Sequence, residues 1–219
     1  MNRIPLYLLI ALSAAACTQT AKTTTSTTTE TTDSVTTISQ SSAKAGTDTA
    51  KVFDISTIPL STHDLGEFPY VKAPEGYAFG SYGNGMNKSD ISEFSKEYFA
   101  VNGKLVPQEG KTCKTGIDLA KKDNKKFNSL LVEQSLDKDI LALGGVQVNN
   151  VPVPVSEIKR IGDAELVDKH YGSSIDYNLL DDIKTYVIRT ADKEVWIQFN
   201  LMNNESGKIA ILEKAVTSK

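Results

Sequence analysis

The chain has 219 residues, of which 24 are Lys or Arg and 27 are Asp or Glu, so its formal net charge at pH 7 is −3. This weakly acidic balance, without a stripe of basic residues, argues against nucleic acid as a partner. The two histidines and two cysteines are too few and too widely spaced for a zinc site, and the sequence predicts neither a metal nor a cofactor.

Residues 1–16 have the order of features typical of a secretory signal peptide. Arg3 is followed by the apolar run Ile4–Ala11 and by the small residues Ala14–Ala16. The apolar run is too short to span a bilayer, which takes about 20 apolar residues. Cys17 directly follows the small residues, and the stretch resembles a bacterial lipoprotein signal, although Ala14 stands where Leu is commoner. The alternative is a soluble secreted protein in which Cys17 has no role.

The lipoprotein resemblance implies that Cys17 becomes the first residue of the mature protein. It would carry a diacylglycerol on its sulfur and a third acyl chain, such as palmitate, on its amino group. Two or more acyl chains hold a protein stably at a membrane. Thr18 follows the cysteine, where an Asp commonly retains such proteins at the inner membrane, and no acidic cluster of the kind that directs surface export is present. We therefore expect an outer-membrane anchor and a protein that faces the periplasm.

Residues 17–51 are dominated by Thr and Ser, and Val35 and Ile38 are their only sizeable aliphatic side chains. A segment with so little apolar surface cannot offset the entropy lost on ordering, so we expect a disordered tether. A flexible chain of this length spans about 30 Å on average. An O-glycosylated stalk is the alternative interpretation.

From Val52 the composition changes to one that can fold, and residues 52–219 are predicted to form a single α+β domain. Asn102-Gly103 lies between the apolar segments Phe99–Val101 and Lys104–Val106, which is the pattern of a β-hairpin with a type I′ turn. A further strand is predicted over Thr112–Ala120.

The middle of the domain mixes both element types. Phe127–Glu133 has a strand-like composition, and Ser135 can cap a short helix that ends at Gly144-Gly145. The apolar residues of this helix that share one face are Leu136, Ile140 and Leu143. A strand begins at Val146, and a second helix is predicted over Asp163–Tyr171, ended by Gly172.

The C-terminal region predicts a three-stranded meander over Thr185–Thr190, Lys193–Leu201 and Lys208–Lys214. In the middle strand, apolar residues alternate with Glu194, Trp196, Gln198 and Asn200, the pattern of a half-buried strand. The expected fold is thus α+β: an antiparallel-rich sheet, made of an N-terminal hairpin and this meander, with two short helices against one face.

Few residues offer catalytic chemistry. His63 lies in a polar loop and His170 at the end of a predicted helix. Cys113 is interpreted as a small residue within a strand, and it should be a free thiol if Cys17 is acylated. A Cys113–His170 dyad is the enzymatic alternative. The glycines at positions 80, 83 and 85 do not have the spacing of a dinucleotide-binding loop, and we interpret them as a flexible loop.

Two stretches, Phe53–Tyr77 and Tyr186–Val216, with GKLVPQEGK between them, resemble the N-terminal region of OmpA-like outer-membrane lipoproteins. The resemblance implies a protein of the cell envelope. The peptidoglycan-binding domain of that family would follow residue 216, so no binding residue can be carried over to this sequence.

Three classes of function fit these observations. The first is a non-enzymatic envelope module that binds a protein or a glycan. The second is a carrier or chaperone for a hydrophobic ligand, held in a cleft lined by Tyr70, Tyr77, Phe79 and Tyr82. The third is an enzyme that uses carboxylates or Cys113. We expect the first class, because the sequence contains no recognisable catalytic constellation.

Overall fold

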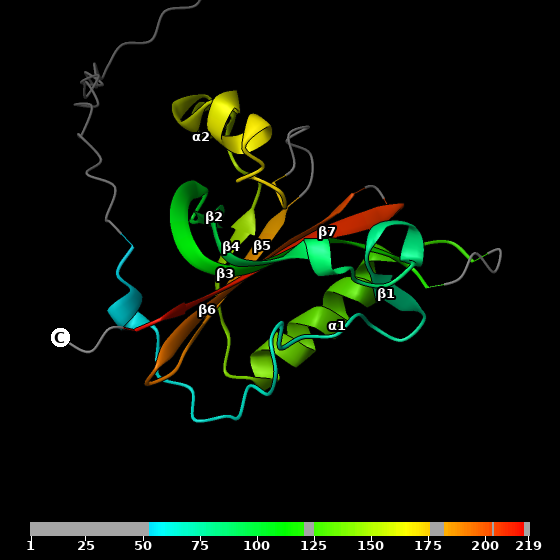
Figure 1. Ribbon diagram of the computed structural model, residues 1–219, viewed down its shortest axis with the longest axis horizontal. Coiled ribbons are helices and arrows are strands. Elements are labelled where there is room, and N and C mark those ends of the chain that lie inside the picture. Colours follow the sequence, from blue (N-terminus) through cyan, green and yellow to red (C-terminus); the bar gives the residue numbers. More distant parts are fainter. Residues whose placement is uncertain (1–52, 121–124, 176–181, 203, 217–219) are drawn as a thin grey trace, which may run out of the picture. The chain divides into compact units, whose positions relative to one another are not determined.

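The computed structural model describes residues 53–120, 125–175, 182–202 and 204–216 (Figure 1). The signal peptide, the acylated Cys17 and the tether predicted for residues 1–51 lie outside the described residues. Seven antiparallel strands form one sheet in the order β1-β3-β7-β6-β5-β4, and β2 also pairs with β3. The strands are β1 (Tyr77–Phe79), β2 (Ile91–Val101), β3 (Lys104–Leu119), β4 (Val146–Val151), β5 (Ile183–Arg189), β6 (Lys193–Met202) and β7 (Ser206–Ala215).

The predicted hairpin is confirmed as β2 and β3. Asn102 and Gly103 have φ angles of 48° and 75°, the two positive values that a type I′ turn requires. The strand predicted from Thr112 is the continuation of β3. This long strand pairs with β2 and then β1 along one edge, and with β7 along the other over Lys111–Ile117.

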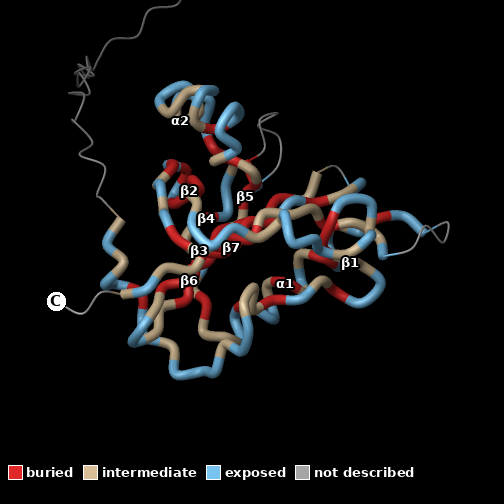
Figure 2. The backbone as a smooth tube through the Cα atoms, in the orientation of Figure 1, coloured by how far each residue is buried: buried red, intermediate tan, exposed pale blue. Residues whose placement is uncertain are grey.

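The predicted C-terminal meander is confirmed as β5, β6 and β7, each paired with the next. The half-buried pattern expected for β6 is wrong, because both faces of this strand are buried. Gln198 is 0% exposed and Asn200 1%, as buried as the apolar residues that alternate with them. Figure 2 shows this burial along the central strands.

The second face of β6 is covered by the β2–β3 hairpin, which bends over it (Figure 1). The tip of the hairpin reaches β4, where the Asn102 amide donates to the carbonyl of Val148 at 3.1 Å. Phe99 packs on Trp196 with ring centroids 5.5 Å apart. A small second core therefore lies between the hairpin and the sheet.

Helix α1 (Ser129–Ala142) packs against the opposite face of the sheet through Val132, Leu136 and Ile140, all 0% exposed. The predicted strand over Phe127–Glu133 is wrong, and Ser135 lies inside the helix. The helix begins earlier because the Asn128 side chain caps it, accepting a hydrogen bond from the Leu131 amide at 3.1 Å. The predicted helix end is confirmed, with Gly144 at φ 82°.

Helix α2 (Val155–Ile161) was not predicted, and the helix expected over Asp163–Tyr171 is only a π-helical turn, Ala164–Asp168. Both elements pack on the apolar side chains Tyr98, Ala100 and Leu105 of the hairpin. Because α1 covers one side of the sheet and α2 the other (Figure 1), the expectation of two helices against one face is wrong. Within the described part of the chain, no helix is long and apolar enough to cross a membrane.

Candidate functional site

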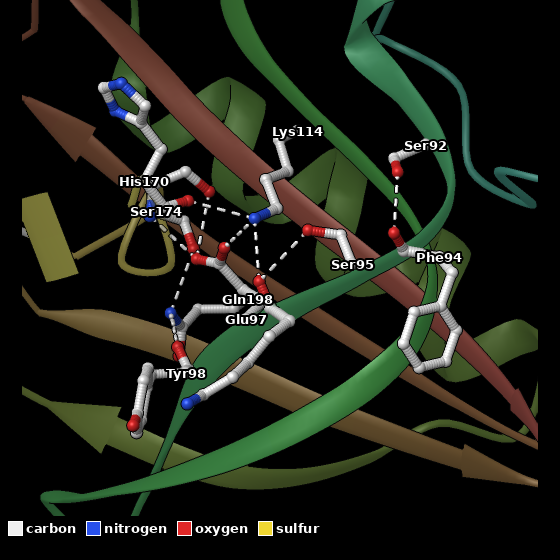
Figure 3. A network of polar contacts seen from close by, with 11 residues as sticks. Ser92, Phe94, Ser95, Glu97, Tyr98, Lys114, His170, Ser174 and Gln198 are labelled. Atoms are coloured by element: carbon white, nitrogen blue, oxygen red, sulfur yellow. Dashed lines mark hydrogen bonds and ion pairs between the residues drawn. The ribbon is translucent and has the colours of Figure 1, made fainter. Parts of the chain in front are cut away.

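A buried ion pair joins the two strands of the hairpin (Figure 3). Glu97 of β2 is 0% exposed, and its Oε2 lies 2.8 Å from Nζ of Lys114 on β3. The same ammonium group donates to the carbonyls of Lys96 at 2.9 Å and His170 at 3.0 Å, so it contacts three protein oxygens. The other carboxylate oxygen of Glu97 accepts from the amide and the hydroxyl of Ser173, at 2.7 and 3.0 Å.

Burial raises the pKa of the Glu97 carboxyl, and the charge of Lys114 together with the Ser173 hydrogen bonds opposes that rise. A buried ion pair of this kind contributes little net stability, but the loss of one partner leaves an unpaired charge in the interior. The pair therefore fixes the loop 170–174 against the hairpin.

Gln198 of β6 forms a second polar centre beside the ion pair (Figure 3). Its Oε1 accepts from the Ala100 amide at 2.6 Å and from the Thr185 hydroxyl at 2.9 Å. Its Nε2 donates to the Tyr98 carbonyl at 3.3 Å and to the Ser174 hydroxyl at 2.9 Å. All four hydrogen-bonding positions of the carboxamide are thus used, and the side chain ties three separate segments together.

A surface hollow of about 370 Å³ lies next to this polar network. Side chains alternate along a strand, so the residues of β3 and β7 that share a face with Lys114 form its floor. One wall is the loop from Gly80 to Tyr82, and the other is Ser173. The floor consists of Lys114, Gly116, Asp118, Ser206 and Lys208.

The two loops beside the hollow have unusual backbone conformations. Tyr82 has φ 61° and His170 has φ 56°, in a region that bulky residues seldom adopt. Tyr70 is the one further described residue, other than Gly and Asn, with a positive φ. Strained residues of this kind are concentrated at functional sites, and Tyr82 lines the hollow itself, which favours a functional role for it.

Glycines set the shape of the wall that carries Tyr82. A Cβ at Gly80 would lie 2.0 Å from the carbonyl oxygen of Gly85, and one at Gly83 would lie 1.8 Å from that of Leu119. Of the three glycines interpreted from the sequence as a flexible loop, Gly80 and Gly83 are therefore closely packed, whereas a Cβ at Gly85 would meet nothing within 4 Å. Gly116 is different, because a Cβ there would meet its nearest atom at an ordinary 3.5 Å.

Cys113 does not belong to this site. It is 0% exposed in the core beneath α1, on the opposite face of β3 from Lys114, and its thiol is free as predicted. Its Sγ lies 3.3 Å from the sulfur of Met86. Burial, with a contribution from the carboxylate of Asp90, raises the pKa of the Cys113 thiol to about 12. The alternative Cys113–His170 dyad does not form, since His170 is exposed on the Lys114 side.

The other predicted candidates are also dispersed. Phe79 is buried in the core beneath α1, and Tyr70 and Tyr77 pack against the same core, whereas Tyr82 is 75% exposed at the hollow. The four aromatics therefore do not line one cleft. His63 is exposed in its loop, and the described residues include no group of three or more side chains able to hold a metal ion.

Sequence reasoning missed Glu97, Lys114 and Gln198. The available signal was a polar residue inside an otherwise apolar strand, as in VWIQFNL around Gln198. A polar side chain in that position marks either a solvent-facing residue or a buried network, and only the path of the hairpin decides between them.

Comparison with protein-family models, curated proteins and solved structures found no significant match to this chain. The geometry of the hollow and of the network behind it is therefore the basis for proposing a function. The likeness to OmpA-like lipoproteins stays a prediction from the sequence.

Proposed function

We propose that this protein is a non-enzymatic binding module of the cell envelope, anchored in the outer membrane by acyl chains on Cys17 and facing the periplasm. Its binding site is the hollow between the Gly80–Tyr82 loop and Ser173. The anchor rests on the Ala-Ala-Ala-Cys junction of the sequence. The observation that carries the proposal is that a hollow with an exposed aromatic side chain is backed by a buried network, in which Glu97 is ion-paired with Lys114 and Gln198 is hydrogen-bonded within the protein.

Within the buried network of Glu97, Lys114 and Gln198, no side chain is free to act as a catalytic acid or base, which must exchange a proton with a substrate. Lys114, the ionisable side chain of the network that reaches the hollow, is held by two backbone carbonyls and by the carboxylate of Glu97. Glu97 is sealed behind it and accepts hydrogen bonds from Ser173. These bonds hold the walls of the hollow in place, which supports a role in recognition.

The volume of the hollow lies near the lower end of the range usual for small-molecule sites, about 300–1,000 Å³. Its floor belongs to two paired strands and its walls to loops that are held in place, so little ordering is needed when a ligand enters. Preorganisation of this kind favours binding, because it lowers the entropic cost of forming the complex.

Filling the hollow tests the proposal. In Gly116→Leu, the new side chain rises from the floor without a backbone clash at Cβ. The lipidated full-length chain would be immobilised and incubated with an envelope extract separated into protein, glycan and lipid pools. We expect one pool to be retained by the wild type and lost with Gly116→Leu, at an unchanged melting temperature.

The matched control is Gln134→Leu, which places the same side chain at an exposed position on α1, against the opposite face of the sheet. It should retain the same pool as the wild type. Equal retention by Gly116→Leu, or chemical conversion of the retained material by the wild type, would overturn the proposal.

A further inference from the structure

We infer that the ligand of the hollow is a carbohydrate, one pyranose ring of which stacks on Tyr82 while its hydroxyl groups bind Asp118, Ser206 and Lys208. This inference rests on the proposed function, since it names the ligand class of the same site. Three features support it: the exposed ring of Tyr82, the unused polar groups on the floor, and the absence of a side chain at position 116.

Tyr82 is displayed at a conformational cost that its own packing does not offset. The left-handed backbone conformation is unfavourable for a residue with a Cβ, and an aromatic ring normally gains stability by burial. The Tyr82 ring is 75% exposed, and Gly80 and Gly83 leave its backbone little freedom to relax. The result is a rigid aromatic surface at the rim of the hollow, ready to cover an apolar face of a ligand.

The floor supplies polar groups that the protein itself does not use. Asp118 accepts one hydrogen bond, at Oδ1 from the Leu119 amide at 2.8 Å, and its Oδ2 has no partner among the described residues. The Lys208 ammonium and the Ser206 hydroxyl likewise make no side-chain hydrogen bond or ion pair with any described residue. One carboxylate, one ammonium and one hydroxyl therefore project from the floor, with no net charge.

A sugar ring matches this combination. Its faces carry C–H bonds that pack on the electron-rich face of an aromatic ring, and its edge carries hydroxyls that both donate and accept hydrogen bonds. A phosphate or nucleotide would call for an excess of positive charge, but on this floor the charge of Lys208 is balanced by that of Asp118, and Lys114 is paired with Glu97. An extended peptide would need a free strand edge, whereas β3 and β7 are paired with each other beneath the hollow.

Gly116 provides the space for the ring. It lies between Lys114 and Asp118 on the floor and pairs with Lys208 of β7. Its φ is not in the left-handed region and a Cβ would fit, so the backbone does not require glycine there. The absence of a side chain keeps the centre of the floor open, directly beside the three unused polar groups.

The test measures binding of defined sugars to the lipidated full-length chain by isothermal titration calorimetry and saturation-transfer NMR. The probes are tetrasaccharides of glucose and of N-acetylglucosamine. We expect at least one to bind. Tyr82→Asn should weaken that binding tenfold or more, because it removes the ring but tolerates the left-handed conformation, and should leave the melting temperature unchanged or slightly raised. Tyr82→Phe keeps the ring and should bind within threefold of the wild type.

Phe94→Ala is the matched control, because Phe94 is an equally exposed aromatic, at 72%, that does not line the hollow. Its binding should be unchanged. Wild-type binding by Tyr82→Asn, or no binding of any sugar probe, would overturn the inference. The proposed function would still stand if Gly116→Leu abolished retention of the envelope pool in the same preparations, so the two failures are distinguishable.

Discussion

The carboxamide oxygen of Gln198 lies 2.6 Å from the backbone nitrogen of Ala100, a residue 98 positions earlier in the chain. The backbone amide of Ala100 points away from β3, towards the other edge of β2. Two further amides of the same edge are paired, Tyr98 with the Tyr171 carbonyl at 2.7 Å and Asn102 with that of Val148 at 3.1 Å. Three different acceptors thus replace a neighbouring strand and protect an edge that could otherwise pair with another chain.

The first prediction concerns Gln198. In Gln198→Leu, the Ala100 amide and the hydroxyls of Thr185 and Ser174 lose their partner in a site that water does not reach. Each buried group left without a hydrogen bond costs about 1–3 kcal/mol, so we expect a loss of about 3 kcal/mol or more in the free energy of unfolding. Urea denaturation followed by circular dichroism would measure it.

Gln147→Leu is the control for that experiment. Gln147 is exposed and makes one side-chain hydrogen bond, to the Tyr186 hydroxyl at 2.9 Å. Its loss should cost no more than about 1 kcal/mol. Similar losses for the two variants would show that the Gln198 network does not close the hairpin onto the sheet.

The second prediction concerns Cys113. A thiol that is 0% exposed, with a pKa raised to about 12, is protonated and inaccessible at neutral pH. The native protein should therefore react with Ellman's reagent at pH 8 far more slowly than the unfolded one, which should show one reactive thiol per chain. Rapid reaction of the native protein would mean that the core beneath α1 opens readily.

The raised pKa of Cys113 also determines how the stability of the fold changes with pH. The folded state holds the thiol proton more tightly than the unfolded state, whose thiol has the ordinary pKa of 9.0. The stability contributed by this group is therefore complete below pH 9 and is lost as the pH rises from 9 towards 12. Cys113→Ala should lose less stability than the wild type over that interval, measured as the difference in unfolding free energy between pH 8 and pH 11.

The third prediction concerns the anchor. If Cys17 is the site of acylation, Cys17→Ser should yield an unprocessed or soluble protein that no longer fractionates with the membrane. Mass spectrometry of the mature wild type should find residue 17 at the N-terminus with its acyl chains. An unmodified Cys17 in the purified protein would remove the basis for the membrane anchor.

The fourth prediction concerns the Thr-rich segment. Limited digestion with trypsin should cut at Lys22, Lys44 and Lys51 and release a soluble fragment that begins near Val52. That fragment should melt as cooperatively as the whole chain and at the same temperature. A melting temperature lower by several degrees, or resistance at Lys44 and Lys51, would indicate that part of the segment is docked on the domain.

Elements specified by local chemistry could be predicted from the sequence. Asn102-Gly103 identifies the hairpin because few residue pairs adopt two positive φ angles, and the alternation around Ile197 identifies β6 as a strand. The start of α1 was misplaced because Ser135 is as good a cap in sequence as Asn128. The choice between them depends on which apolar face, that of Val132, Leu136 and Ile140, meets the sheet.

The candidate site could not be predicted, because it depends on where the hairpin bends. From the sequence, Glu97 and Gln198 would be expected to face solvent. In the structure the path of the hairpin buries both. Tyr82 reads as an ordinary loop residue until the backbone shows its positive φ and its position at the rim of the hollow. The burial of Gln198 and Glu97 arises from contacts between residues 98 and 76 positions apart, and no local pattern records it.

The bend of the hairpin also constrains the order in which the protein can fold. The first long strands depend on the last ones: β3 pairs with β7, and the Ala100 amide of β2 donates to Gln198 of β6. Contacts so distant in sequence form slowly, since a long loop must close before they are gained. Until β7 is made, the edge of β3 that it covers stays open, and until β6 is made the Ala100 amide lacks its acceptor, so a nascent or truncated chain would be prone to aggregation.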